Sequence, residues 1–264
     1  MKLFVKIILV LSAIYVREAA CQENGTSEVA DSATKLEITD VPNVVVIYTL
    51  PCSSSLECDA IYCTGIILSA GYVATAASCV TIPNTITTYN TTQIFAGGKG
   101  PGTAEQTRGI SNYLIHSNYD PTSCCGKFPY DLVVLQLSSS LTLGPNVTVS
   151  KIATTAPKIG DTLYAVGLGE DYTLEYVTTE VNCSYECFKT NKCARDANYG
   201  ATICAQREGV TVCDNWYKGG PFFLKDQQTV AALILGPLKP SCINGGVNYG
   251  VALSEFLGAL APYT

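Results

Sequence analysis

Three residues with ionisable or potentially nucleophilic side chains stand inside compact motifs of this sequence. Ser78 lies in the stretch TAASC, Asp131 begins DLVVLQL, and Lys218 precedes Gly219-Gly220-Pro221 in CDNWYKGGPFF. A hydroxyl, a carboxylate and an amine are groups from which a nucleophile, an orienting anion and a base can be built. The first question is whether these residues perform acyl-transfer chemistry or only pack together.

The identity of the base is the main difficulty for such a site. An imidazole accepts a proton near neutral pH because its pKa lies at about 6.5, whereas a serine hydroxyl does not. The chain has one histidine, His116, in LIHSNYD. A Ser78–Lys218 dyad with lysine as the base is the other catalytic alternative. A neighbouring Asp131 carboxylate would raise the lysine pKa and keep the amine protonated, which argues against the dyad.

The elements that position these residues are predicted to be short β-strands. From residue 44 onward, segments rich in Val, Ile, Leu, Tyr and Thr alternate with clusters of Gly, Pro, Asn and Ser. This spacing is typical of an all-β sandwich or a pair of barrels. Helical periodicity is confined to the end, in LSEFLGAL at residues 253–260. The predicted strand segments are VVVIYTL, YCTGIIL, GYVATA, TQIFAG, NYLIH, DLVVLQL, TLYAVGL, TVAALIL and NYGVAL.

The first 20 residues have the pattern of a secretory signal peptide. Lys2 and Lys6 precede an apolar run from Ile7 to Val16, and small residues place the cut near Ala20 or Cys21. An uncleaved anchor is the alternative, but the run is shorter than the roughly 20 residues that span a bilayer. Residues 21–40 are polar and acidic and are predicted to form a loose N-terminal segment.

The 13 cysteines indicate an oxidising compartment, so we expect disulfides and a secreted, extracellular protein. If Cys21 leaves with the signal peptide, 13 − 1 = 12 remain. A zinc site from Cys183, Cys187 and Cys193 would need a fourth ligand and thiolates that survive secretion, so we expect neither a metal nor a cofactor. N-glycosylation sequons, which mark surface positions, begin at Asn24, Asn90, Asn146 and Asn182.

Charged residues are sparse, at 14% of the chain, and the net charge is −6. The sequence contains no cluster of Lys and Arg. Nucleic acid and anionic membrane surfaces are therefore not expected as partners. The chain after the signal peptide is long enough for a large β domain with a substantial core.

Six motifs in order resemble the chymotrypsin-like serine proteases, over roughly residues 41–264. The resemblance implies two packed six-stranded antiparallel β-barrels with a short C-terminal helix and a cleft between the barrels. It places the N-terminal barrel at about 41–155 and the C-terminal barrel at about 156–264. The matching motifs are CTGIILSAGYVATAASC, NYLIHSNYD, YDLVVLQL, YAVGLG, CDNWYKGGP and NYGVALSEFLGAL.

The resemblance places Ser78 where the family has its catalytic histidine, and Asp131 where it has its aspartate. Lys218 stands at the position of the nucleophilic serine. Because the nucleophile loop is one residue longer than in the family, counting from its cysteine would instead put Tyr217 there, which again is no serine. His116 matches a non-catalytic surface histidine. The resemblance therefore predicts that the histidine and the serine of the triad are replaced, by Ser78 and Lys218, that the aspartate is retained as Asp131, and that the site is not catalytic.

Neighbouring positions are altered as well. Trp216 replaces the oxyanion-hole glycine, and Tyr217 replaces the aspartate that pairs with the new N-terminus after zymogen cleavage. Thr211 stands where trypsin-like members have the aspartate of the specificity pocket. The family's activation site is approximated only by Lys35-Leu36-Glu37-Ile38, which lacks both glycines.

The resemblance also implies three disulfides, Cys63–Cys79, Cys193–Cys204 and Cys213–Cys242. The pairing of six further cysteines stays open, with Cys52–Cys58 and Cys183–Cys187 the simplest pairs by spacing. Cys124 and Cys125 are adjacent and would more easily bond elsewhere than to each other.

These observations predict a secreted, non-catalytic serine protease homologue that acts by binding an extracellular protein, as a cofactor, decoy or regulator. We expect a monomer in which Lys218 offsets the Asp131 charge and the Ser78 hydroxyl donates to the same carboxylate. The alternatives are an active serine endopeptidase that uses Ser78 and Lys218, and a structural or storage protein.

Overall fold

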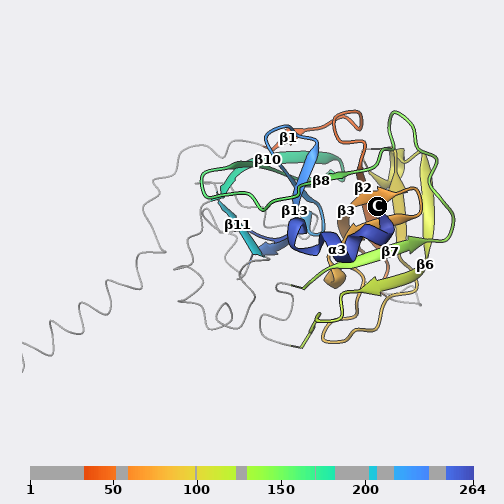
Figure 1. Ribbon diagram of the computed structural model, residues 1–264. Helices are drawn as coiled ribbons and strands as arrows, with labels where there is room; N and C mark the ends of the chain where they lie inside the picture. Colours follow the sequence, from red (N-terminus) through yellow and green to blue (C-terminus); the bar gives the residue numbers. More distant parts are fainter. Residues whose placement is uncertain are drawn as a thin grey trace, which may run out of the picture.

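The computed structural model describes residues 33–51, 59–98, 100–122, 130–169, 171–181, 202–206, 217–237 and 248–264. The predicted signal peptide, residues 1–20, lies outside these ranges, as does the following stretch to residue 32. The described residues form two barrels of antiparallel strands, which lie side by side (Figure 1). In these ranges no helix combines the length and the apolar character that crossing a membrane requires.

The first barrel is closed by six strands in the order β2-β3-β4-β7-β6-β5, all paired antiparallel. Their β-branched and aromatic residues suit a pleated, buried surface, and five of the six residues of β2 are buried. The strands are β2 (Val44–Thr49), β3 (Ile61–Ser69), β4 (Tyr72–Thr75), β5 (Gln93–Ala96), β6 (Gln106–Ile115) and β7 (Val133–Leu137).

The second barrel is also a ring of six antiparallel strands, in the order β9-β10-β11-β14-β13-β12 and back to β9. Both rings confirm the predicted fold class. Two short strands add to the second ring: β1 (Thr34–Lys35) pairs with β10, and β8 (Lys151–Ile152) pairs in parallel with β13. The ring strands are β9 (Thr162–Leu168), β10 (Leu174–Val181), β11 (Thr202–Gln206), β12 (Pro221–Phe223), β13 (Thr229–Pro237) and β14 (Asn248–Ala252).

The chain ends in a short helical segment that returns to the first barrel. It comprises η7 (Leu253–Phe256), α3 (Leu257–Leu260) and η8 (Ala261–Tyr263). The Ser69 hydroxyl donates to the Tyr263 carbonyl at 2.6 Å, and the Tyr72 and Tyr263 rings lie 5.1 Å apart. In Figure 1 the C-terminus accordingly lies over the strands of the first barrel. The segment therefore ties β14 of the second barrel to the first.

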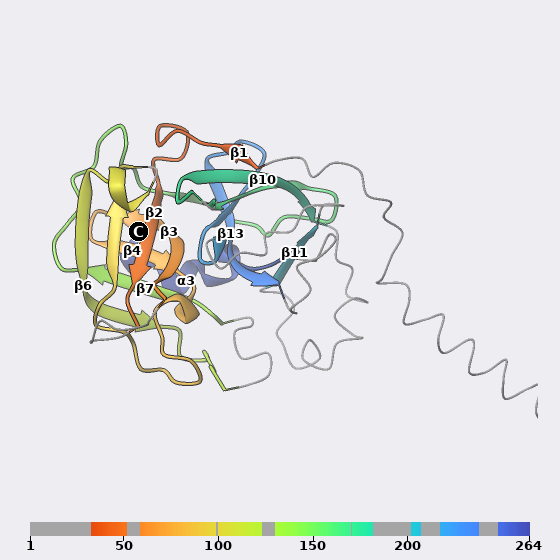
Figure 2. The same ribbon diagram turned by 180° about the vertical axis from the view of Figure 1, so that it is seen from behind.

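The apolar core runs continuously from one barrel to the other. Val133 and Leu135 of β7 belong to the same buried cluster as Val166 and Leu168 of β9. A second cluster fills the interior of the second barrel around Leu163, Phe222 and Ile234. Figure 2 shows the two sets of strands from behind. Because close-packed interiors resist displacement, this shared core gives the loops between the barrels fixed supports.

Residues 34–41 differ from the loose segment that the sequence predicts up to residue 40. Lys35 pairs with Glu175 of β10, and the Leu36 amide donates to the Leu174 carbonyl at 3.0 Å. Leu36 and Val41 are both buried. A two-residue strand carries no periodic pattern, so its docking depends on β10 and not on local propensity.

Candidate functional site: a buried aspartate and the Gly-Gly-Pro loop

Asp131 is completely buried two residues before β7, and its carboxylate accepts two hydrogen bonds from one residue. The backbone N–H of Ser78 donates to Oδ1 at 2.7 Å, and the Ser78 hydroxyl donates to Oδ2 at 2.6 Å. Hydrogen bonds to an ionised acceptor are roughly twice as strong as bonds between neutral groups. Both carboxylate oxygens therefore hold the turn that contains Ser78.

The position of Ser78 is set by a short 3-10 turn, η2 (Ala77–Cys79), directly after β4. The Cys79 amide donates to the Ala76 carbonyl at 3.0 Å, which closes the turn. A disulfide joins Cys79 to Cys63 of β3. Ala77 and Cys79 face the core, while Ser78 is half-buried and turns to Asp131. The small side chains of this stretch let the turn pack closely against the barrel.

A tyrosine supports the same region. The Tyr119 hydroxyl lies 3.2 Å from the Thr81 hydroxyl. Burial, followed by the negative charge of Asp131, raises the pKa of Tyr119 to about 12. The Tyr119 phenol is therefore protonated at neutral pH and supplies no base beside Asp131.

The backbone after Lys218 is wedged between the two barrels. The Lys218 carbonyl accepts a hydrogen bond from the Thr64 amide of β3 at 2.9 Å, and the Gly219 amide donates to the Ile234 carbonyl of β13 at 2.7 Å. Gly219 has φ +77°, and a Cβ there would collide with the Thr75 hydroxyl oxygen. Glycine is required at this residue both for its backbone conformation and for the space. The Gly-Gly-Pro motif thus joins the barrels.

Lys218 lies in the same region as Ser78 and Asp131. The Sγ atom of Cys79, the residue after Ser78, is 3.8 Å from the Lys218 carbonyl oxygen. The Lys218 side chain is half-buried. The structure thus brings the three sequence-predicted positions together, and the ion pair between Lys218 and Asp131 stays a prediction.

The Tyr217 side chain points away from Lys218 and Asp131, into the second barrel. It is buried, and its hydroxyl donates to Oε1 of Glu175 at 2.6 Å. Its ring occupies the space beside Gly167 of β9, where a Cβ would lie 2.5 Å from the Tyr217 Cα and Cγ atoms. Gly167 of β9 pairs with Glu175 of β10. One strand pair therefore provides both the surface against which the Tyr217 ring packs and the acceptor of its hydroxyl.

The role of Glu175 was not anticipated from the sequence. Its Oε2 atom lies 3.1 Å from the Lys35 ammonium, which also contacts Asp171 at 2.7 Å. The hydrogen bond to Asp171 raises the pKa of Lys35, and the same bond lowers the pKa of Asp171 to about 2. We call Tyr217, Glu175 and Lys35 the Glu175 link. The one sequence signal was the alternation within LEYVTTEV, which does not identify a partner for Glu175.

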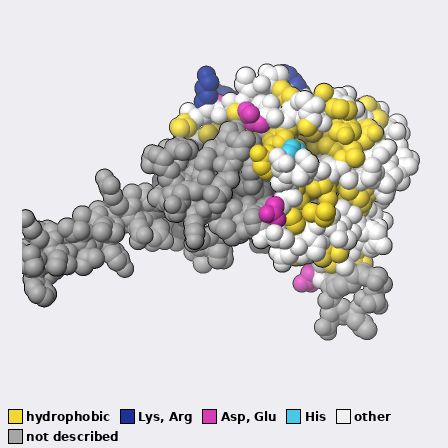
Figure 3. Space-filling view, turned by 60° about the horizontal axis from the view of Figure 1, so that its bottom comes forward, with side chains coloured by type: hydrophobic (Ala, Val, Ile, Leu, Met, Phe, Trp, Pro, Cys, Tyr) yellow, Lys and Arg dark blue, Asp and Glu magenta, His cyan; other side chains and the backbone are white. Residues whose placement is uncertain are grey.

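The described contacts of the His116 side chain include neither Ser78 nor Lys218. Its ring stacks on Tyr130 at 5.0 Å and meets the edge of Phe256 at 5.3 Å, and its Nδ1 accepts the Asn118 amide at 3.2 Å. Burial lowers the pKa of His116. Figure 3 shows the histidine at the surface among hydrophobic side chains. Its described contacts are aromatic packing and a turn hydrogen bond, which fit the structural role that was predicted.

Several predicted positions lie outside the described residues, including Thr211 and Trp216. Cys204 is buried in β11. Asn90 is exposed, whereas the Asn146 side-chain nitrogen, to which a glycan would be attached, donates to Glu105 at 2.6 Å. The remaining positions outside the description are Cys52, Cys58, Cys124, Cys125, Cys183, Cys187, Cys193, Cys213, Cys242, Asn24 and Asn182.

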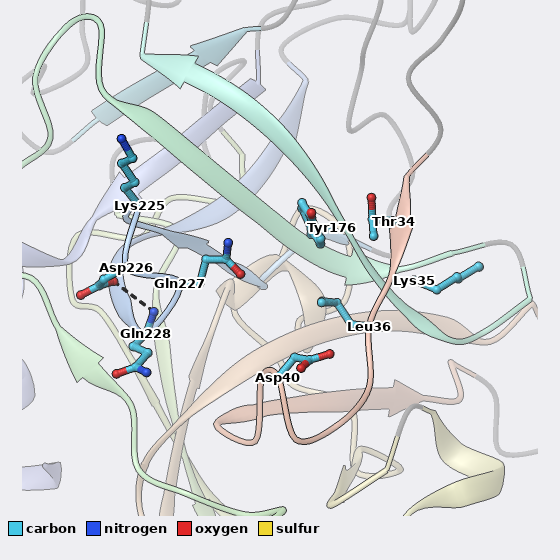
Figure 4. A pocket seen from close by; sticks show the side chains of 9 residues that line it. All are labelled: Thr34, Lys35, Leu36, Asp40, Tyr176, Lys225, Asp226, Gln227 and Gln228. Atoms are coloured by element: carbon cyan, nitrogen blue, oxygen red, sulfur yellow. Dashed lines mark hydrogen bonds between the residues drawn. The ribbon is translucent and has the colours of Figure 1, made fainter.

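A shallow polar groove lies where β1 and β10 face the turn before β13 (Figure 4). Thr34, Leu36 and Tyr176 approach it from one side, and Gln227 and Gln228 from the other. The Gln228 amide is held by Asp226 at 3.0 Å within the turn. Lys35 and Leu36, from the stretch that approximates the activation site, line the groove, whereas Ser78, Asp131 and Lys218 do not. Among the described residues, no group of three His, Cys, Asp or Glu side chains is arranged to hold a metal ion.

Two closed antiparallel barrels, a buried aspartate before β7 and a Gly-Gly-Pro turn wedged between the barrels define a protein of the chymotrypsin-like class. The sequence profile of the trypsin family matches residues 43–254. This chain therefore belongs to the trypsin family.

Individual relatives are distant. Trypsin alpha of Drosophila melanogaster is 24% identical over 207 residues, which cover 75% of this chain and 72% of the relative. The scabies mite inactivated protease paralogue S-I1 has a TM-score of 0.71 at 21% identity, covering 88% of this chain and 98% of its own. HL collagenase reaches the same TM-score of 0.71 at 15% identity, with coverage of 88% and 96%. An inactivated protease and a collagenase are thus equally similar in fold, so activity must be argued from the site.

Proposed function

We propose that this chain is a catalytically inactive member of the trypsin family that is secreted and acts by binding another extracellular protein. The Ser78–Asp131 pair is the observation that carries the proposal. The family's catalytic carboxylate orients an imidazole, whereas both oxygens of Asp131 accept hydrogen bonds from Ser78. With Lys218 before the Gly-Gly-Pro turn, this site has neither the imidazole nor the serine of the family mechanism.

The geometry also argues against the Ser78–Lys218 dyad. In a dyad the serine hydroxyl donates its proton to a neutral lysine amine. Here the Ser78 hydroxyl donates to Oδ2 of Asp131 instead. A carboxylate beside Lys218 would favour the charged ammonium, which cannot accept a proton.

We propose further that the Lys218 ammonium offsets the Asp131 charge. The carboxylate is completely buried, and a buried charge without a counter-charge is costly. The Lys218 backbone lies beside the turn that holds Asp131, and its side chain is half-buried. Serine in place of histidine leaves room next to the carboxylate that a lysine side chain is long enough to reach.

Active-site labelling tests the loss of catalysis. The full-length protein is treated with a fluorophosphonate probe, beside an active trypsin and beside the variant Ser78→Ala. We expect labelling of trypsin only. Covalent labelling of the wild-type protein at Ser78 that disappears in Ser78→Ala would overturn the proposal and support the unconventional endopeptidase.

Binding is proposed because the barrels of this fold provide a rigid support, while the surface loops can form binding sites. A rigid double barrel can carry variable surface loops whose binding role does not depend on catalysis. Affinity capture from the extracellular fluid of the source tissue, followed by a measured Kd for the captured protein, tests this role. A storage protein would instead accumulate in that fluid with no saturable partner.

Secretion is proposed from the N-terminal pattern, the cysteine content and the Cys63–Cys79 disulfide. N-terminal sequencing of the mature protein should begin near Cys21. Treatment with an N-glycosidase should lower its mass, with Asn90 the most accessible of the described sequons. An intracellular protein that keeps Met1 and carries no glycan would refute this part.

A further inference from the structure

The Glu175 link connects the N-terminal segment to the loop at the nucleophile position. Tyr217 donates to one oxygen of the Glu175 carboxylate at 2.6 Å, and Lys35 approaches the other at 3.1 Å. Tyr217 and Glu175 are 42 residues apart, and Lys35 and Glu175 are 140 apart. A single carboxylate therefore joins three distant parts of the chain.

The N-terminal end of the link is fixed by strand pairing. Lys35 of β1 stands directly opposite Glu175 of β10, a register that brings their side chains together. The Leu36 amide continues the pairing at 3.0 Å, and the Leu36 side chain is buried. Both Figure 1 and Figure 2 show β1 lying along β10. Lys35 is thus held at Glu175 by its backbone as well as by its charge.

The other end of the link is fixed by packing. Tyr217 is 4% exposed and lies against Gly167, where no side chain larger than hydrogen fits. The Tyr217 carbonyl accepts the Gly220 amide at 3.0 Å, and the Gly219 amide is held by Ile234. Displacing Tyr217 would therefore move the backbone of the residues that follow it.

We infer that Glu175 is a positioning residue through which the uncleaved N-terminal segment orders the loop 217–220. Tyr217 donates a neutral phenol proton to a carboxylate that is largely buried, with a side chain 14% exposed. Lys35 offsets the Glu175 charge from the solvent side, where its own side chain is 54% exposed. The loop is ordered by an intact chain, with no new N-terminus needed.

The direction of the effect of cleavage follows from this arrangement. A cut between Lys35 and Leu36 would leave Lys35 on the N-terminal fragment, which the two-residue strand β1 joins to the described part of the molecule. Loss of that fragment would remove the positive end of the link. Cleavage at this bond should therefore loosen the loop.

Amide hydrogen exchange at Gly219 and Gly220 tests the inference, because both amides are hydrogen-bonded in the structure. Four single variants of the full-length protein are compared with wild type: Tyr217→Phe, Glu175→Gln, Lys35→Met and the control Lys158→Met. Lys158 is an exposed lysine away from the link. The amide of Ile67 in the first barrel, bonded to Asn43, reports global unfolding.

Tyr217→Phe removes a bond to a charged acceptor and should speed exchange at both glycines by about tenfold or more. Lys35→Met should speed exchange at both glycines by about two- to fivefold, because the ion pair that it removes is partly solvent-exposed. Lys158→Met and the Ile67 amide should not change. In Glu175→Gln, adding Lys35→Met should have no further effect.

Two results would overturn the inference. One is exchange at Gly219 in Lys35→Met that equals exchange in Lys158→Met. The other is an effect of Lys35→Met that is the same with and without Glu175→Gln.

Discussion

The carboxylates of Asp131 and Glu175, which bind Ser78 and Tyr217, are held in opposite ways. Asp131 is completely buried, and both of its described donors come from one residue, Ser78. Glu175 lies nearer the surface and receives Tyr217 from one part of the chain and Lys35 from another. Each carboxylate uses both oxygens, but the first holds a local turn and the second joins distant segments.

The difference implies that Asp131 mainly stabilises the fold, whereas Glu175 mainly fixes the relative position of separate segments. A buried carboxylate with strong hydrogen bonds is costly to disturb, because any change leaves polar groups without solvent. An ion pair near the protein surface contributes little to stability, since water replaces a lost partner. Its value lies in fixing the relative position of the elements that it joins. We therefore expect large stability effects at Asp131 and small ones at Lys35.

The largest effect is expected for Asp131→Asn. Asparagine keeps the shape but removes the charge, so a paired Lys218 would be left with an uncompensated charge. Breaking a buried pair in this way costs about 3–5 kcal/mol. Urea unfolding at neutral pH measures the loss.

A double-mutant cycle with Lys218→Met shows whether Lys218 is the partner of Asp131. Lys218→Met should cost much less in the Asp131→Asn background than in wild type. The control Lys158→Met should cost the same in both backgrounds. An equal cost of Lys218→Met with and without the Asp131 carboxylate would refute the ion pair and leave Ser78 as the known donor.

Gly167→Ala is expected to have the next largest effect, and it acts at the Tyr217 end of the Glu175 link. The new Cβ would lie 2.5 Å from Tyr217 atoms, so the ring must shift. Overpacking of this kind costs about 1–3 kcal/mol. Thermal unfolding measures the cost, and Gly109→Ala in β6 is the control because a Cβ there meets only an ordinary contact at 3.5 Å. Equal losses in the two variants would mean that Tyr217 is not held tightly.

The sequence predicts the fold and the Ser78–Asp131 pair because both depend on local patterns and on a resemblance. Short apolar segments separated by turn residues indicate the barrels, and TAASC and DLVVLQL identify the two partners. A serine beside an aspartate has an evident hydrogen bond to make. The structure has that bond at 2.6 Å.

The Glu175 link could not be predicted, because each of its contacts depends on tertiary register. Nothing local in LEYVTTEV distinguishes Glu175 from Glu180, yet only Glu175 lies opposite Lys35. The strand β1 is too short to carry a period. From the sequence, Tyr217 was interpreted as the loss of an ion pair or as a residue at the nucleophile position, since a buried acceptor for its hydroxyl is not visible in the sequence.

A smaller effect on stability is expected for Lys35→Met, and its dependence on salt distinguishes it from the effect of removing the buried Ser78–Asp131 hydrogen bond. The variant should cost about 0.2–1 kcal/mol at low salt, as for other exposed pairs. This cost should shrink as salt is added, because screening weakens interactions between solvent-exposed charges. The cost of Ser78→Ala, measured in the same urea series, should stay constant. A salt-independent loss in Lys35→Met would mean that Lys35 acts through packing and not through charge.

The smallest effect is expected in acid, at Asp171. Its folded pKa of about 2 lies below the ordinary value of 3.8, mainly because Lys35 donates to it. A lowered carboxyl pKa gives stability that is present above the ordinary value and is lost as the pH falls through the folded value. The difference in urea midpoint between wild type and Lys35→Met should therefore be constant from about pH 5 upward and shrink below about pH 4. If that difference is unchanged at the lowest pH at which both proteins stay folded, the ion pair between Lys35 and Asp171 does not contribute to stability.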